Sequence, residues 1–336
     1  MKDVLILGIE SSCDETAAAI VKNGRDILSN VINSQIDIHQ QFGGVVPEVA
    51  SRKHIENIAG VVDKAFKDAE LNYSDIDAVA VANTPGLVGA LLVGVSFAKG
   101  FAYALDKPLI AVNHLHGHIY ANFLGRENIS FPAICLVVSG GHTSLLYMQS
   151  RGDLKLIGET RDDAAGEAFD KVARFLGLGY PGGPAIQKAA GQGEAGRYKL
   201  PRVFLDRDDF EFSFSGLKTA AMNLWRKSEK QGNASVYDLA AEFQEALVEV
   251  LVEKTVKAAR EYKVSTILMA GGVAANQKLR NMLKKRAEDL VLQLYYPPLN
   301  LCTDNAAMIA GDAHYHYINE DFAPLNLNAH PGLWSL

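Results

Sequence analysis

Hydrophobic and polar positions near the start of the chain predict a β-hairpin. Residues 4–9 are continuously apolar, residues 10–16 are polar, and a second apolar run at 17–21 is followed by Asn23-Gly24. An unbroken short apolar run is typical of a strand covered on both faces, and Asn-Gly is typical of a tight hairpin turn. We therefore expect paired strands that are joined by polar turns.

The elements that follow alternate in type. Residues 47–66 have the spacing of a helix, 78–82 of a strand, 87–104 of a helix and 109–112 of a further strand. A strand–helix–strand unit joins two parallel strands, so part of the sheet is expected to be parallel.

The hairpin pattern recurs in the middle of the chain. Residues 133–138 are apolar, 139–144 form a polar turn, and 145–148 are apolar again. A repeated hairpin followed by helices indicates a duplicated α/β domain with a cleft between the copies. We expect a first lobe at 1–128 and a second at 129–336, with the last helix free to return to the first lobe. The later elements are expected to be helices at 166–176, 236–262 and 275–287 and a strand at 266–269.

Composition indicates a soluble, cytoplasmic globular protein. Of 336 residues, 48% are hydrophobic and 21% charged, and the net charge of −6 argues against indiscriminate binding of nucleic acid. The three cysteines form no CxxC pair, which suits a reducing compartment. The first apolar run is too short for a signal peptide. The uncharged stretch at 78–98 is broken by the turn at 83–86, so it predicts a strand and a buried helix rather than a membrane span.

Three glycine-containing turns, at 139–141, 180–184 and 270–273, could bring backbone N–H groups close to phosphate oxygens. Each alone is weak evidence, because Gly-Gly is more often simply a tight turn. The chain has neither GxxxxGK[ST] nor GxGxxG, which sets aside Walker-type and Rossmann sites. With the repeated hairpin, these turns predict duplicated actin-like or sugar-kinase-like (ribonuclease-H-like) α/β domains and a nucleotide cleft between two lobes.

A histidine-rich segment predicts a metal site. His114 and His118 are four residues apart, so they share one face of a helix, while His116 lies about 200° around it. Asp304 is the acidic residue best placed to supply a third ligand. Two alternatives stay open: the histidines are ordinary core residues, or Asp304 only caps the helix that follows. The segment is not a zincin motif, because Leu115 stands where that motif has its catalytic Glu.

Nine motifs, in order along nearly the whole chain, closely resemble the bacterial tRNA N6-adenosine threonylcarbamoyltransferase family, formerly labelled O-sialoglycoprotein endopeptidase. They are GIESSCDET (8–16), GGVVPEVASRKH (43–54), NHLHGH (113–118), VVSGGHT (137–143), DDAAGEAFDKVAR (162–174), YPGGP (180–184), FSFSGLKTA (212–220), AGGVAAN (270–276) and CTDNAAMIA (302–310).

The resemblance implies an actin-like enzyme with one catalytic metal, iron or zinc. Such an enzyme transfers a threonylcarbamoyl group from threonylcarbamoyl-AMP to N6 of the adenosine 3′ of the anticodon, in tRNAs that read codons beginning with A. It also implies three partner proteins: an inactive paralogue, a small ATPase and a separate enzyme that makes the adenylate. The implied metal ligands are His114, His118 and Asp304. The implied adenylate pocket is Val137, Val138, Ser139, Gly140, Gly141, Asp170, Gly183, Gly272 and Asn276.

Two positions depart from the family pattern. His116 stands where the family usually has Glu or Ala, and it should face away from the metal. Val137 stands where archaeal relatives have a metal-binding Tyr, which leaves a coordination position for substrate or water.

The transfer needs a group that takes a proton from the attacking amine. Asp14 and Glu15, on the first hairpin turn, are the candidates for this base or for a substrate anchor. The alternative is that they form ion pairs with a neighbouring Lys or Arg. Two other functions remain open at this point: an ATP-dependent small-molecule kinase of the same fold, and a nucleotide-switched binding module without turnover.

Overall fold

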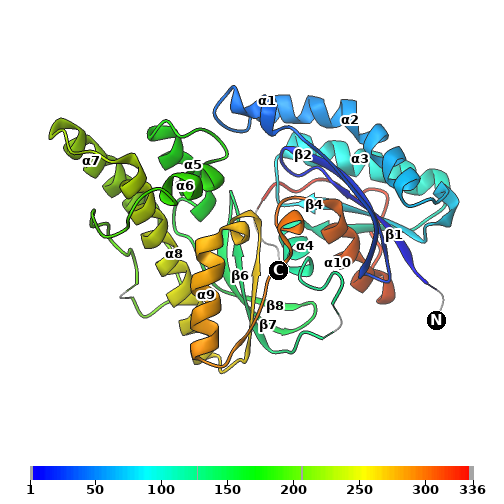
Figure 1. Cartoon of the computed structure of the whole chain (residues 1–336). Coiled ribbons are helices and arrows are strands. Elements are labelled where there is room, and N and C mark those ends of the chain that lie inside the picture. Colours follow the sequence, from blue (N-terminus) through cyan, green and yellow to red (C-terminus); the bar gives the residue numbers. More distant parts are fainter. Residues whose placement is uncertain (1–2, 127, 206, 333–336) are drawn as a thin grey trace. The chain divides into compact units, whose positions relative to one another are not determined.

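The computed structural model describes residues 3–126, 128–205 and 207–332. The chain divides into two compact units: Met1–Ile129 together with Pro297–Leu336, and Ser130–Tyr296. Figure 1 shows that the last helix, α10 (Ala306–Ile318), lies in the first unit, although it is far from that unit's other elements in sequence.

The first unit is built on a five-stranded sheet with the order β3-β2-β1-β4-β5. β1 pairs antiparallel with β2 and parallel with β4, and β4 pairs parallel with β5. The elements of this unit are β1 (Leu5–Glu10), β2 (Glu15–Lys22), β3 (Asp26–Ser34), α1 (Ile36–Gln40), α2 (Pro47–Asp68), η1 (Tyr73–Asp75), β4 (Ala78–Thr84), α3 (Val88–Leu105), β5 (Leu109–Asn113), α4 (His114–Tyr120), η3 (Leu299–Leu301) and α10.

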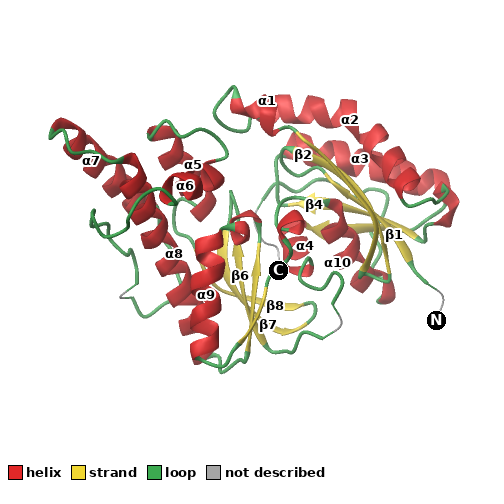
Figure 2. Ribbon diagram, viewed as in Figure 1, coloured by secondary structure: helices red, strands yellow, loops and turns green. Residues whose placement is uncertain are grey.

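Helices cover both faces of this sheet. Alternate residues of a strand point to opposite faces, so Ile6 faces α10 and Leu7 faces α2 and α3. This two-sided burial is the reason that residues 4–9 are continuously apolar, and Figure 2 shows the helices on either side of the strands.

The helix α3 is apolar and long enough to cross a membrane by length and composition alone, although only 33% of its 18-residue window is buried. Its buried residues, among them Ala90, Leu91, Val95 and Ala98, follow helical spacing along one side. Val95 and Ala98 pack in the same core as β4 and α2. One such helix packed on a sheet is typical of the core of a soluble α/β protein.

The second unit repeats the strand order of the first. Its five-stranded sheet has the order β10-β9-β6-β7-β8, with β6 antiparallel to β7 and parallel to β9. The elements are β6 (Ala133–Val138), β7 (Thr143–Ser150), β8 (Asp153–Glu159), α5 (Ala165–Phe175), α6 (Gly182–Ala190), α7 (Ser215–Lys230), α8 (Val236–Glu261), β9 (Thr266–Ala270), η2 (Gly272–Ala275), α9 (Gln277–Asp289) and β10 (Gln293–Tyr295). The duplicated, actin-like α/β fold predicted from the repeated hairpin is confirmed.

Several boundaries differ from the predicted ones. The first polar turn is shorter than 10–16, because Glu10 completes β1 and Glu15 and Thr16 already pair in β2. Buried polar residues are possible there because hydrogen bonds satisfy them: Thr16 Oγ1 lies 2.8 Å from His54 Nδ1.

Candidate functional site

The helix α4 begins where β5 ends and carries two of the predicted metal ligands. Its N-cap is Asn113, whose side chain accepts hydrogen bonds from Leu115 N at 2.9 Å and His116 N at 3.4 Å. This cap fixes where the helix starts, and the helical spacing then puts His114 and His118 on one face. Both imidazoles are buried, and their ring centroids are 4.6 Å apart.

Asp304 approaches both histidines from the segment that precedes α10. Its Oδ1 lies 3.1 Å from His118 Nε2 and 3.6 Å from His114 Nε2. The N-cap of α10 is Asn305, whose side chain accepts a hydrogen bond from Met308 N at 3.0 Å. The alternative in which Asp304 merely caps this helix is therefore wrong.

The three side chains form a possible His/Asp metal site. One potential ligand atom from each of His114, His118 and Asp304 lies within 4.8 Å of the others. Two imidazole nitrogens and one carboxylate oxygen suit zinc and iron, and three protein ligands leave a position for water or substrate. The donor set therefore fits one divalent cation.

The other ring nitrogen of His114 is held by residues of the first strand and turn. His114 Nδ1 lies 2.8 Å from Glu10 Oε2 and 3.0 Å from Ser12 Oγ. Burial lowers the pKa of His114, but the charges of Glu10 and Asp304 outweigh this effect and raise it to about 9. The same negative potential attracts a cation. Glu10 was not among the predicted site residues; its one signal in the sequence is a carboxylate as the last residue of a buried strand.

The two predicted catalytic carboxylates lie where the first turn enters β2. Asp14 and Glu15 are both buried, and Ser34 Oγ donates a hydrogen bond to Glu15 Oε1 at 3.1 Å. Burial raises the pKa of Glu15 well above its usual value, and the charges of Asp304 and Asp14 raise it further. No Lys or Arg of the described residues forms an ion pair with either carboxylate, so the ion-pair alternative does not hold there.

His116 is not among the described residues that form the cluster. Burial lowers the pKa of His116 to about 4, and the charge of His316 contributes to the same effect. His116 is therefore a neutral imidazole near pH 7.

In the second unit, two of the glycine turns lie at the same edge of the sheet. β6 and β9 are parallel, and Val137 is paired with Ala270, so the turns that follow both strands leave from their carboxyl ends. The first turn is closed by Ser139 N donating to His142 O at 2.8 Å and by His142 N donating to Ser139 Oγ at 3.1 Å. Val137 and Val138 are fully buried residues at the end of β6, directly before this turn.

The helix α5 begins against this turn. Gly166 N donates to Ser139 O at 3.1 Å, and a Cβ at Gly166 would lie 2.8 Å from Gly140 Cα. Only glycine allows the helix N-terminus to approach so closely. The predicted nucleotide turn therefore lies next to the positive end of a helix dipole, which favours an anion.

Four of the predicted pocket residues are glycines with open space where a side chain would be. A Cβ built at any of them would meet no atom of the chain within 4 Å, so a ligand could approach the backbone at these points. These glycines are Gly140, Gly141, Gly183 and Gly272.

The remaining two pocket residues already have partners in the structure. Asp170 Oδ1 accepts a hydrogen bond from Gly182 N at 2.6 Å, which ties α5 to the start of α6. Asn276 is the N-cap of α9: its Oδ1 accepts from Leu279 N at 3.0 Å, and its amide donates to Gln244 Oε1 at 2.9 Å. Both therefore position backbone segments beside the open glycines.

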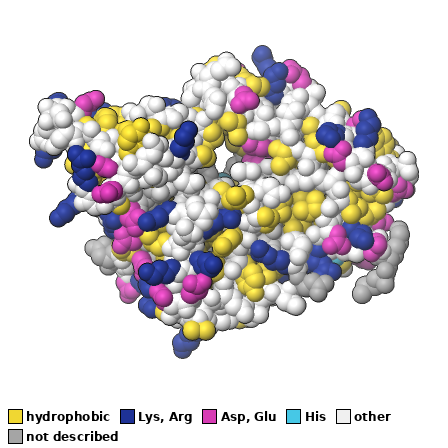
Figure 3. Space-filling model, in the orientation of Figure 1, with side chains coloured by type: hydrophobic (Ala, Val, Ile, Leu, Met, Phe, Trp, Pro, Cys, Tyr) yellow, Lys and Arg dark blue, Asp and Glu magenta, His cyan; other side chains and the backbone are white. Residues whose placement is uncertain are grey.

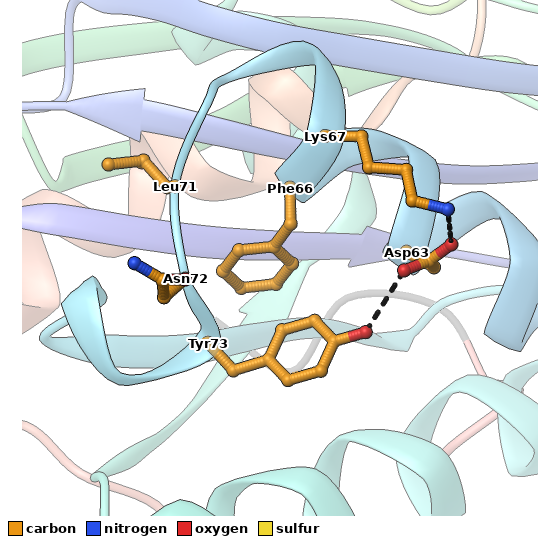
Figure 4. Close-up of a pocket in the computed structure, with 6 residues that line it drawn as sticks. All are labelled: Asp63, Phe66, Lys67, Leu71, Asn72 and Tyr73. Atoms are coloured by element: carbon orange, nitrogen blue, oxygen red, sulfur yellow. Dashed lines mark hydrogen bonds and ion pairs between the residues drawn. The ribbon is translucent and has the colours of Figure 1, made fainter.

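A shallow hollow elsewhere on the first unit contains none of the predicted site residues. Figure 4 shows it at the end of α2, where Asp63 accepts a hydrogen bond from Tyr73 at 3.1 Å and forms an ion pair with Lys67 at 2.6 Å. Asp63, Lys67 and Tyr73 are paired with one another, and we assign this hollow no role.

Both units have the same strand order, and a His/Asp cluster lies at the edge of the first sheet. These features define the class as an actin-like protein with a possible metal site. Solved structures agree on the fold. The chain resembles full-length HypF with a TM-score of 0.62 at 15% identity, covering 96% of this chain and 56% of that one. It resembles component A of the (R)-2-hydroxyglutaryl-CoA dehydratase of Acidaminococcus fermentans with a TM-score of 0.58 at 14% identity, covering 95% and 99%.

Sequence comparison identifies the family. The family model described as tRNA N6-adenosine threonylcarbamoyltransferase matches residues 26–311. Proteins of that name are 75% identical in Syntrophomonas wolfei subsp. wolfei, over 100% of this chain and 99% of the relative, and 56% identical in Moorella thermoacetica, over 98% and 96%. The chain belongs to the tRNA N6-adenosine threonylcarbamoyltransferase family. It is a transferase that modifies tRNA, as the nine motifs predict, and the kinase and binding-module alternatives are not favoured.

Proposed function

We propose that the chain transfers threonylcarbamoyl from threonylcarbamoyl-AMP to N6 of the adenosine 3′ of the anticodon, in tRNAs that read codons beginning with A. The carbonyl carbon forms a bond to N6, its bond to the AMP phosphate oxygen breaks, AMP leaves, and the amine loses a proton. The observation that carries the proposal is the cluster of His114, His118 and Asp304, whose ligand atoms lie within 4.8 Å of one another, in a chain of this family.

Those three residues would hold one iron or zinc ion. When bound, the ion supplies a Lewis acid that polarises the carbonyl group of the donor. The two imidazoles and the carboxylate would hold the coordination geometry, and burial of the histidines limits the movement of their rings.

The adenylate pocket would be formed by the second unit. The N–H groups at Gly140 and Gly141, beside the N-terminus of α5, can offset the charge of the leaving phosphate. Val137, Val138 and Ser139 shape that turn, and Asp170 with Gly183 would hold the ribose. Gly272 and Asn276 would line the adenine side. The open space at the four glycines supports this assignment.

A carboxylate on the first turn would take the proton from N6. The raised pKa of Glu15 makes its carboxylate a stronger base than that of an exposed glutamate, and Asp14 is its neighbour. We rank Glu15 first for that reason and Asp14 second.

The protein would work in the cytoplasm with an inactive paralogue, a small ATPase and a separate enzyme that makes the adenylate. The helices α2 and α3 pack against each other, and both expose large apolar side chains that suit a protein partner: Ile55, Val88 and Leu92 are 66%, 51% and 41% exposed. On the face in Figure 3, Lys and Arg side chains are interspersed with Asp and Glu, so that view offers no continuous basic stripe for tRNA.

The test is transfer activity of Asp304→Asn with the adenylate and tRNA supplied, together with the metal content of the purified protein. We expect activity to fall by roughly 100-fold or more, because even indirect partners of a metal cost 10–100-fold. His316→Ala is the matched control, since His316 pairs with Asp321 at 2.8 Å and is absent from the cluster. Normal transfer by Asp304→Asn would contradict the metal assignment, and phosphate transfer from ATP to a small molecule would favour a kinase.

A further inference from the structure

Glu10 is a buried carboxylate for which the proposed chemistry has no step. Its side chain is 0% exposed at the end of β1, and no described Lys or Arg forms an ion pair with it. Burying a carboxylate is costly unless it is paired and hydrogen-bonded, so its partners must compensate. Two groups lie within hydrogen-bond distance of it: Ser12 N donates to Oε1 at 2.5 Å, and His114 Nδ1 lies 2.8 Å from Oε2.

This geometry decides which nitrogen of His114 can bind a cation. Nδ1 lies at hydrogen-bond distance from Glu10 Oε2, and a histidine that binds a metal through one nitrogen donates its other ring N–H to such a carboxylate, so we place the hydrogen on Nδ1. The lone pair of a neutral ring is then on Nε2, which faces Asp304 Oδ1 at 3.6 Å. Ser12 Oγ, 3.0 Å from the same Nδ1, can only share that hydrogen as a second acceptor.

His118 has no equivalent support. Its Nε2 also faces Asp304, at 3.1 Å, but within the described part of the chain its buried Nδ1 has no hydrogen-bond partner. Of the two imidazoles, His114 is therefore the one whose outer nitrogen is held by a carboxylate.

We infer that Glu10 is a positioning residue for the metal site: it fixes the ring orientation of His114 and the tautomer that presents Nε2 to the cation. This inference rests on the metal site of the proposed function. Outer partners of this kind typically change metal affinity by 10–100-fold when they are removed.

The geometry makes Glu10→Gln a sharp test. Glutamine has one acceptor oxygen, whereas both Ser12 N and His114 Nδ1 are donors at this side chain. The backbone N–H of Ser12 cannot change, so the glutamine oxygen should remain there and its amide should face Nδ1. The imidazole would then switch its hydrogen to Nε2 and lose the lone pair that binds the metal.

The experiment titrates metal-free full-length protein with zinc against a chromophoric chelator at one fixed pH. We expect Glu10→Gln to bind zinc 10–100-fold more weakly and Ser12→Ala to stay within about threefold of the wild type. Glu56→Gln, at an exposed residue paired with Lys53, should be unchanged. The visible spectrum of the cobalt-loaded protein should change in Glu10→Gln, which a purely structural role would not require.

A direct measurement on the wild type covers the case in which Glu10→Gln does not fold. In zinc-loaded protein with 15N-labelled histidine, His114 should show a protonated Nδ1 and a metal-bound Nε2. A metal-bound Nδ1, or zinc affinity of a folded Glu10→Gln within twofold of the wild type, overturns the inference. If the wild type and Asp304→Asn both fail to bind zinc, the metal site of the proposed function is what fails.

Discussion

Replacing Gly8 by alanine should disturb the metal site through the packing of α10 on β1. A Cβ at Gly8 would lie 2.7 Å from Ala310 N and 2.9 Å from Ala310 Cβ, and it would also overlap Ala306 O. Two of these three atoms belong to the helix backbone, so no side-chain rotation can relieve the overlap. The helix as a whole must move away from the strand. Asp304 lies two residues before α10 and should move with it.

The size of the effect follows from the overlap. Adding a methyl group to a closely packed core costs about 1–3 kcal/mol. For a unit of this size, each kcal/mol lowers the melting temperature by roughly 2–4 °C, so the first unit should melt roughly 2–12 °C lower. Zinc affinity should fall as well, by about tenfold, because Asp304 no longer meets His118 at the present distance of 3.1 Å.

The assay combines thermal unfolding with zinc titration. Gly60→Ala is the matched control: Gly60 lies inside α2, and a Cβ there would meet no atom within 4 Å. That variant should be more stable by about 0.4–1 kcal/mol, because alanine favours the helix, and its zinc affinity should be unchanged. If Gly8→Ala melts within 1 °C of the wild type and binds zinc normally, the reasoning that links α10 packing to Asp304 is refuted.

Two further predictions concern stability. Burial lowers the pKa of His54 below its usual 6.5, so as the pH falls the unfolded chain takes up this proton before the folded chain does. The neutral buried imidazole therefore contributes fully to the unfolding free energy above about pH 6.5, and this contribution is lost at lower pH. Urea unfolding at pH 7 and pH 5 should show a smaller drop in unfolding free energy for His54→Asn than for the wild type. Arg202 pairs at 2.6 Å with Glu242, whose side chain is only 4% exposed, so Arg202→Met should lower the unfolding free energy by about 1–3 kcal/mol. The control is Lys284→Ala, at an exposed pair with Glu288, which should change the unfolding free energy by less than about 0.5 kcal/mol. Equal changes in the two variants would contradict the role given to burial.

The predicted strands contain short apolar runs, which are longest in strands that have a buried face on each side. β1, β4, β6 and β9 lie in the middle of their sheets, and their continuous apolar runs are visible in the sequence. β3 is different: Ser29 is its one buried residue among nine, so no apolar alternation marks it. It forms because it pairs with β2, and such pairing depends on residues far from its own segment.

The candidate metal site shows the same division between local and distant information. Two histidines four residues apart can be recognised from spacing alone, because the helix itself brings them together. Asp304 is 186 residues from His118 and was a candidate only because of its chemistry and of the resemblance. Glu10 was missed, because a carboxylate at the end of a buried strand acquires its role only when β5 places His114 beside it.

The repeated strand order explains why one chain can carry two different kinds of site. In both units the first strand runs parallel to the fourth, so the turn after it leaves at the carboxyl edge of the sheet. At this edge of the first unit β1 ends in Glu10, whose carboxylate lies 2.8 Å from Nδ1 of His114, a member of the candidate metal cluster. After β6 the corresponding turn contains Gly140 and Gly141, which leave the backbone N–H groups open. The edge of the first sheet therefore depends on a specific side chain, whereas the edge of the second depends on the absence of one. Gly140→Val should accordingly impair adenylate binding and leave zinc affinity unchanged.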